Sequence, residues 1–108
     1  MQSRDMDQMT ALGDPLRRQI VELLSRKPSS VQQIADQLPV TRSAVSQHLR
    51  VLSQAELVSH KVQGTRHVYY IDAEGLRKVR AYLDKLWEGA LGEFKAAADK
   101  KGSRKAAS

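Results

Sequence analysis

One segment, residues 41–54, combines side chains that can bind a polyanion with the spacing of an amphipathic helix. Thr41 can begin the helix by accepting a hydrogen bond from a free backbone N–H of the first turn. Apolar residues recur at positions 45, 49 and 52, which is the spacing of one buried helical stripe. The opposite arc carries hydroxyl, amide and guanidinium groups, which can hydrogen-bond base edges and phosphates in the major groove of DNA. These groups belong to Ser43, Ser46, Gln47 and Arg50.

The absence of carboxylates distinguishes this helix from an ordinary solvated one. A solvated face is usually rich in Glu and Lys, whereas no Asp or Glu occurs from Thr41 to Gln54. The segment therefore predicts a helix that lies against DNA. Arg42 lies nearer the buried border, so we expect it to reach a phosphate. Which side chain reads a base stays open, because phosphate contacts position a protein whereas base contacts specify the sequence.

The same helix also carries residue types that occur in catalytic and metal-binding sites. Ser43, Ser46 and His48 include a nucleophile and a base, but neither serine has the acid partner or the oxyanion donors that acyl transfer needs. We therefore expect no enzyme activity. His48 lies about 60° from the centre of the buried stripe, and no second ligand shares its face. We expect it to be structural or to contact a phosphate.

Composition indicates one small domain with a polyanionic partner. The 108 residues carry 18 Lys and Arg against 12 Asp and Glu, a formal net charge of +6 that favours nucleic acid over a membrane surface. Half of that excess lies in a basic segment, residues 99–108. No cysteine is present, which excludes disulfides and thiolate metal sites. Without an apolar span or a signal core, we expect a soluble cytoplasmic protein associated with the nucleoid.

Three shorter helices are expected before the segment 41–54. A leading helix lies within residues 1–12. Asp14 and Pro15 begin a second, which ends at about Arg26 because Lys27 precedes a proline. Ser29 and Ser30 begin a third, within residues 31–38. Two helices joined by a few residues, the second polar on its outer face, predict a helix-turn-helix.

Residues 57–71 change to the pattern of a β-hairpin. Two β-rich runs, 57–63 and 66–71, flank a turn at Gly64 and Thr65, so the hairpin forms a wing that can reach a phosphate backbone. His60 and His67 lie on opposite strands and can pair across the hairpin, but two ligands make a weak metal site. The predicted DNA-binding residues are Thr41, Arg42, Ser43, Ser46, Gln47, His48, Arg50, Lys61, Gln63, Thr65, Arg66 and His67.

The last helix, begun by Asp72, carries more apolar surface than a lone terminal helix needs. We therefore expect a second copy of the chain to cover it. Gly89 and Gly92 either permit close helix approach or weaken the helix end. The basic tail 99–108 is expected to be disordered, which leaves one domain over residues 1–98. The predicted dimer interface comprises Met6, Met9, Leu76, Val79, Leu83, Leu86, Trp87, Ala90, Leu91 and Phe94.

The predicted fold is mainly α with a small β-hairpin: four helices, two strands and a long helix, in the order of a winged helix-turn-helix. Four segments in this order resemble the ArsR-type winged-helix repressors of bacteria. They are ALGDPLRR at 11–18, SAVSQHLRVL at 43–52, AELV at 55–58 and QGTRHVYY at 63–70. The resemblance extends over about residues 9–94.

The resemblance implies a homodimer formed by the first and last helices. It also implies a palindromic DNA operator with one recognition helix per half-site. Members of the family commonly repress transcription until a ligand, often a metal ion, lowers their affinity for DNA. Metal-sensing members carry Cys-x-Cys where this sequence has Ser30 and Gln32, and the last helix here has no histidine. The sequence therefore resembles the metal-independent subgroup, with no metal or cofactor expected and the effector unknown.

Two other interpretations stay open from the sequence. One is a metal-responsive sensor that uses histidines and carboxylates, although such scattered carboxylates suit borderline metals poorly. The other is a winged-helix module that binds proteins and not DNA. The group around Trp87 and Phe94 is interpreted as a dimer core in preference to a ligand pocket. Low aromatic content makes stacking on single-stranded nucleic acid a poor alternative.

Overall fold

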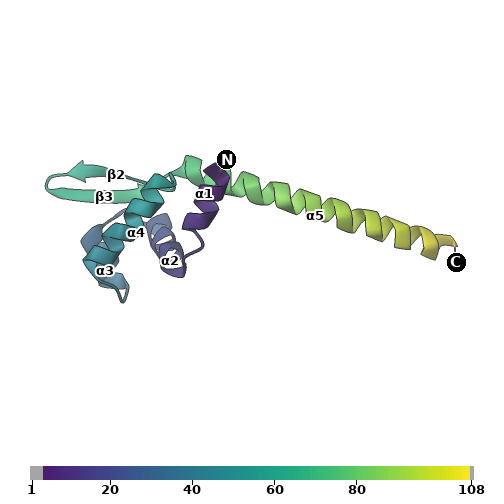
Figure 1. The fold of residues 1–108 in the computed structure, drawn as a ribbon, viewed down its shortest axis with the longest axis horizontal. Helices are drawn as coiled ribbons and strands as arrows, with labels where there is room; N and C mark the ends of the chain where they lie inside the picture. Colours follow the sequence, from purple (N-terminus) through teal and green to yellow (C-terminus); the bar gives the residue numbers. More distant parts are fainter. Residues whose placement is uncertain (1–3, 108) are drawn as a thin grey trace.

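A computed structural model describes the backbone of residues 4–107 and the side chains of residues 8–99. Four helices and a small sheet form the body of the molecule (Figure 1). The wing extends from one end of this body and the last helix from the opposite end. The longest dimension is 72 Å, against 30 and 21 Å for the other two. The elements are α1 (Arg4–Ala11), α2 (Pro15–Arg26), β1 (Ser29–Ser30), α3 (Val31–Gln37), α4 (Arg42–Gln54), β2 (Val58–Gln63), β3 (Arg66–Ile71) and α5 (Ala73–Ala107).

The predicted helix starts are confirmed by their caps. Asp14 Oδ1 accepts hydrogen bonds from the backbone N–H groups of Leu16 and Arg17 at 2.8 and 3.1 Å. Ser30 begins α3 through a reciprocal capping box with Gln33, and Thr41 Oγ1 accepts from a backbone N–H of α4 at 3.1 Å. These caps satisfy backbone donors that a helix leaves free, so local sequence defines where each helix begins.

The cap at Asp14 makes part of the stability depend on pH. The backbone hydrogen bond from Arg17, aided by that residue's positive charge, lowers the pKa of Asp14. Because the folded pKa lies below the unfolded one, the cap stabilises the fold above the unfolded pKa. That contribution is lost as the pH falls through the folded pKa. We expect wild type to have a higher Tm than Asp14→Asn at neutral pH, and the gap to close as the pH falls below 3.8, the ordinary pKa of an aspartate. Thermal unfolding followed by circular dichroism measures the two Tm values as the pH is lowered. A difference in Tm that does not change with pH would contradict a pH-dependent contribution from the Asp14 cap.

The sheet has three strands where the sequence predicted two. Its order is β1-β3-β2, all antiparallel, with Ser29 opposite Tyr69 and Ser30 opposite Val68. The hairpin itself is as predicted, with Val58 opposite Ile71 and Gln63 opposite Arg66. β1 was missed because two residues are too short to show an alternating pattern. It joins the helix-turn-helix to the wing by main-chain pairing.

The core lies where the helices of the body meet the base of the wing. Val45, Leu49 and Leu52 are at most 1% exposed, which confirms the predicted stripe of α4. Ile20, Ile34 and Leu57, from α2, α3 and the turn after α4, are fully buried apolar side chains of the same core. Their burial holds α4 with its polar arc outward.

A close backbone contact determines where α5 leaves the body. Glu56 ends α4 with a left-handed φ of 61°. The N–H groups of Glu56 and Leu57 bond back to the carbonyls of Ser53 and Leu52 at 3.0 and 2.9 Å, which is a Schellman motif. Gly75 of α5 packs on this turn so tightly that a Cβ there would overlap the Glu56 carbonyl oxygen and lie 2.8 Å from its carbon.

α5 has a buried start and an exposed remainder. Val79 is 8% exposed and belongs to the core of its own chain, which corrects its assignment to the dimer interface. Leu76 and Met9 also pack against this core. The three- and four-residue spacing that placed Val79 on the stripe does not reveal where the body ends. The side chain of Met6 lies outside the described residues.

Two further features of α5 bear on the predictions. The helix continues to Ala107, past Asp99, where a disordered tail was expected. Alanine, lysine and arginine dominate that segment, and they are strong helix formers. A Cβ added at Gly89 or Gly92 would meet nothing within 4 Å, so neither glycine is needed for packing within the chain. No described helix is long and apolar enough to cross a membrane.

Candidate DNA-binding surface

The outward arc of α4 is the centre of the candidate surface. Ser43, Ser46, Gln47 and Arg50 are all exposed, as the spacing of the buried stripe requires. Thr41 and Arg42 are exposed at the start of the helix. The arc therefore presents donors and acceptors to solvent without a carboxylate among them.

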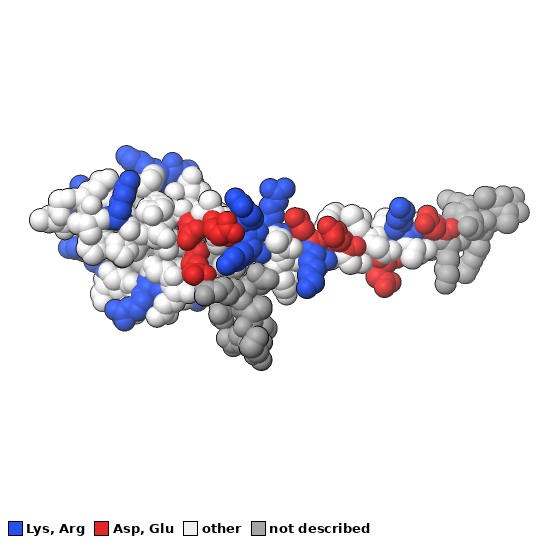
Figure 2. Space-filling model, turned by 90° about the horizontal axis from the view of Figure 1, so that it is seen from above, with Lys and Arg blue, Asp and Glu red and all other residues white. Residues whose placement is uncertain are grey.

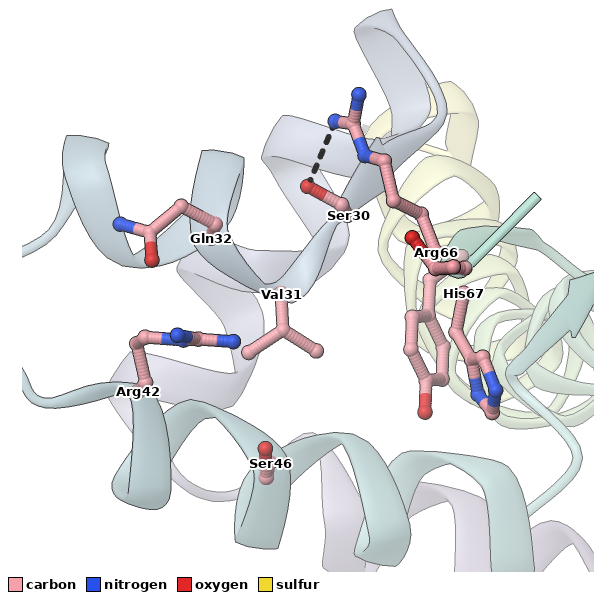
Figure 3. A pocket seen from close by; sticks show the side chains of 9 residues that line it. Ser30, Val31, Gln32, Arg42, Ser46, Arg66 and His67 are labelled. Carbon is pink, nitrogen blue, oxygen red and sulfur yellow. Dashed lines mark hydrogen bonds between the residues drawn. The ribbon is translucent and has the colours of Figure 1, made fainter. Parts of the chain in front are cut away.

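A pocket of about 350 Å³ lies between α4 and the wing. Arg42 and Ser46 face it from α4, while Arg66 and His67 face it from β3 (Figure 3). Its remaining lining residues are Ser30, Val31, Gln32, Thr65 and Tyr69. Two guanidinium groups and several hydroxyls suit this pocket to a phosphate oxygen. The structure thus brings the predicted residues of the helix and the wing onto one groove.

Arg66 also joins the wing to the helix-turn-helix. Its Nη2 donates to Ser30 Oγ at 3.2 Å (Figure 3). That oxygen also accepts a hydrogen bond from the Gln33 N–H at 3.2 Å. Ser30 is 5% exposed, so the acceptor is held in a nearly buried position. Sequence reasoning did not assign Ser30, Gln32 or Tyr69 to the surface. Only the pairing of β1 with β3 brings them there.

The tip of the wing is polar and exposed at Lys61, Gln63 and Thr65. His60 and His67 lie on one face of it with parallel rings 4.9 Å apart, so the predicted pairing across the hairpin is a stack. Parallel rings do not aim their nitrogens at a common point. Among the described residues, no group of three or more His, Cys, Asp or Glu is arranged to hold a metal ion.

His48 contacts a residue that the sequence did not single out. It is half-buried, and its Nδ1 lies 3.3 Å from Nη1 of Arg17 on α2. No periodic pattern marks Arg17, because the contact joins residues 31 positions apart.

The charges are distributed unevenly over the molecule. On the face seen in Figure 2, Lys and Arg are spread over the body and its wing end. Asp and Glu begin where the body meets α5 and are interspersed with Lys and Arg along that helix, whereas none is visible at the wing end. The wing end is therefore the more favourable side for a polyanion.

Comparison with known proteins identifies the family. Residues 14–60, from the start of α2 into β2, match the arsR family of bacterial regulatory proteins. The HTH-type transcriptional regulator Rv2034 of Mycobacterium tuberculosis is 47% identical over 92 residues, covering 85% of this chain and 86% of the relative. The chain belongs to the ArsR family. It is thus a winged helix-turn-helix transcriptional regulator, and regulators of this family are DNA-binding proteins without enzyme activity.

Solved structures of ArsR-type proteins share the fold. An ArsR-like transcriptional regulator from Rhodococcus sp. RHA1 is 30% identical, with a TM-score of 0.75 over 91% of each chain. The homodimeric winged helix-turn-helix DNA-binding domain of Mb0332 from Mycobacterium bovis is 26% identical, with a TM-score of 0.66 over 82% of each chain. In this ArsR-family chain, Ser30 and Gln32 line an arginine-containing pocket, which is a poor setting for a cation.

Proposed function

We propose that this ArsR-family chain is a homodimeric repressor that binds a palindromic DNA operator. One α4 would enter the major groove of each half-site while the wing contacts the adjacent backbone. The observation that carries the proposal is the exposed, carboxylate-free arc of α4 beside the pocket that contains Arg42 and Arg66. The bound dimer would block polymerase sterically, in the cytoplasm at the nucleoid, and no effector is assigned.

The dimer follows from the uncovered stripe on α5. Leu83, Leu86, Trp87, Leu91 and Phe94 are between 44% and 71% exposed and recur on one side of the helix. Such an apolar stripe on a helix that extends from the body favours a second helix against it. α1 packs beside the start of α5, so it can contribute to the same interface. A two-fold axis there would present two copies of α4 to two half-sites.

Within each half-site, the side chains of this surface fall into two groups, those that would reach base edges and those that would reach the phosphate backbone. Gln47 and Arg50 protrude furthest from the buried stripe and are the candidates for base edges. Arg42, Arg66 and the polar wing tip lie to one side, where a phosphate backbone would pass. This division predicts that changes at the groove-facing residues alter specificity, while changes at the pocket weaken binding to every sequence.

Arg50→Ala tests the proposal. The substitution should weaken binding to a duplex selected from random-sequence DNA by about tenfold to a hundredfold, because a base or phosphate contact to arginine is worth about 1–3 kcal/mol. Fluorescence anisotropy measures the Kd, and analytical ultracentrifugation should show an unchanged dimer. Lys85→Ala removes the same charge from α5, on the exposed side opposite Leu83 and Phe94, and serves as the matched control.

The alternative of a protein-binding module predicts a different result. If Arg50→Ala and Lys85→Ala both bind DNA as wild type does, or if no duplex is selected at all, the repressor proposal is wrong. A Kd that is insensitive to salt would also contradict it, since phosphate contacts release counterions.

A further inference from the structure

A helix in a major groove has two flanks, and each faces one phosphate backbone. On α4 one flank carries Arg42 and Ser46, which line the pocket beside the wing. His48 lies on the other flank, roughly 200° around the helix from Ser46. That second flank faces α2 and not the wing, so the residues that support it come from a different element.

Arg17 of α2 supports His48 directly. Its guanidinium donates from Nε to the carbonyl oxygen of Ala11 at 2.6 Å and from Nη1 to His48 Nδ1 at 3.3 Å. Asp14 Oδ2 lies 4.0 Å from the same Nη1, and the Arg17 side chain is only 18% exposed. The guanidinium is therefore held between the end of α1, the cap of α2 and the recognition helix.

This arrangement determines which imidazole nitrogen carries the proton. A guanidinium has donors only, so the Nδ1 that faces Arg17 must be the acceptor. The neutral ring then carries its hydrogen on Nε2. The half-buried His48 thus has one nitrogen occupied by the protein and a fixed N–H donor for another partner.

We propose that Arg17 is a positioning residue for DNA binding, which orients His48 so that its Nε2–H donates to a phosphate on the α2 side of the recognition helix. This inference rests on the proposed function, since it adds a contact on the second flank of the same DNA-binding helix. The ligand chemistry is a backbone phosphate, because the flanks of a groove-bound helix meet the backbones while its outermost residues meet the bases.

Arg18 supplies a matched control for Arg17. Its Nη1 donates to the carbonyl oxygen of Leu12 at 2.8 Å, so it also joins α2 to the end of α1, but it is exposed and contacts no residue of α4 among the described hydrogen bonds. Arg17→Met should weaken binding to the selected duplex by about tenfold, the value of a charge-assisted hydrogen bond. Arg18→Met should change the Kd by less than about twofold. In a His48→Ala background the two substitutions should have equal effects.

A second pair of variants leaves Arg17 in place. The amide nitrogen of glutamine occupies about the position of Nε2 and that of asparagine the position of Nδ1. His48→Gln should therefore retain most of the affinity, while His48→Asn should lose about tenfold. Nitrogen NMR of wild type should show the Nε2–H tautomer, and Arg17→Met should show a mixture of tautomers.

The outcomes separate this inference from the proposed function. If Arg50→Ala weakens binding but Arg17→Met and Arg18→Met have the same effect, Arg17 does not position His48. An affinity kept by His48→Asn and lost by His48→Gln would also overturn the inference. If Arg50→Ala itself has no effect, the DNA-binding proposal fails first.

Discussion

Replacing Gly75 with alanine should lower the free energy of unfolding by at least about 3 kcal/mol, because the new Cβ would overlap backbone atoms that cannot rotate away. The overlap is with the carbonyl of Glu56, and the Cα of Leu57 would lie only 3.2 Å away. Relief requires moving the start of α5 or the turn after α4. Both are fixed, since the Asp72 N–H donates to the Leu57 carbonyl at 2.9 Å.

Gly92→Ala is the control for this prediction. Nothing lies within 4 Å of a Cβ added there, and Gly92 lies on the side of α5 opposite Phe94 and Leu83. Alanine should therefore raise the stability by about 1 kcal/mol through helix propensity. Urea unfolding followed by circular dichroism measures both variants. If both substitutions change the free energy of unfolding equally, the contact of Gly75 with the Glu56 carbonyl does not disfavour a Cβ at position 75.

The Gly75 contact also bears on function. It determines the direction in which α5 leaves the body, and α5 carries the proposed dimer stripe. The separation of the two copies of α4 must match the spacing of the half-sites. A folded Gly75→Ala protein should therefore bind the operator more weakly even where α4 is intact. A wild-type Kd for such a protein would contradict this link.

Trp87→Glu should convert the dimer into a monomer at micromolar concentration. Trp87 is 64% exposed in the single chain and lies at the centre of the stripe, flanked by Leu86 and Leu91. The change removes a large apolar contact, worth about 1.5–3 kcal/mol, and places a carboxylate in its position. A two-fold interface contains each residue twice, so the dissociation constant of the dimer should rise by about a hundredfold or more.

The matched control adds the same charge on the other side of the helix. Ala96 is exposed and lies roughly 180° around α5 from Trp87, so Ala96→Glu should leave the dimer intact. Sedimentation velocity measures the oligomeric state, and the DNA Kd should weaken only for Trp87→Glu. If that variant sediments like wild type, a different face of the chain forms the dimer.

Local sequence was sufficient for the starts of α2, α3 and α4, for the hairpin and for the buried face of α4, but not for the two-residue strand β1. Asp14, Ser30 and Thr41 begin helices through their own side chains, so a helix start can be predicted from a few neighbouring residues. The spacing of Val45, Leu49 and Leu52 determined which side of α4 is buried and therefore which side is free for DNA. The apolar stripe of α5 is longer than the body of one chain can cover, which predicted that a second copy of the chain packs against it.

Contacts between elements were decided only by the tertiary structure. Arg17 with His48, Arg66 with Ser30, and Gly75 with Glu56 each join residues that are distant in the sequence. The periodicity that predicted a polar face could not show which neighbour supports it. The same limit explains Val79, whose spacing matches the exposed stripe although it lies in the core. Sequence spacing determines the face of a helix on which a side chain lies, whereas packing determines what that face meets.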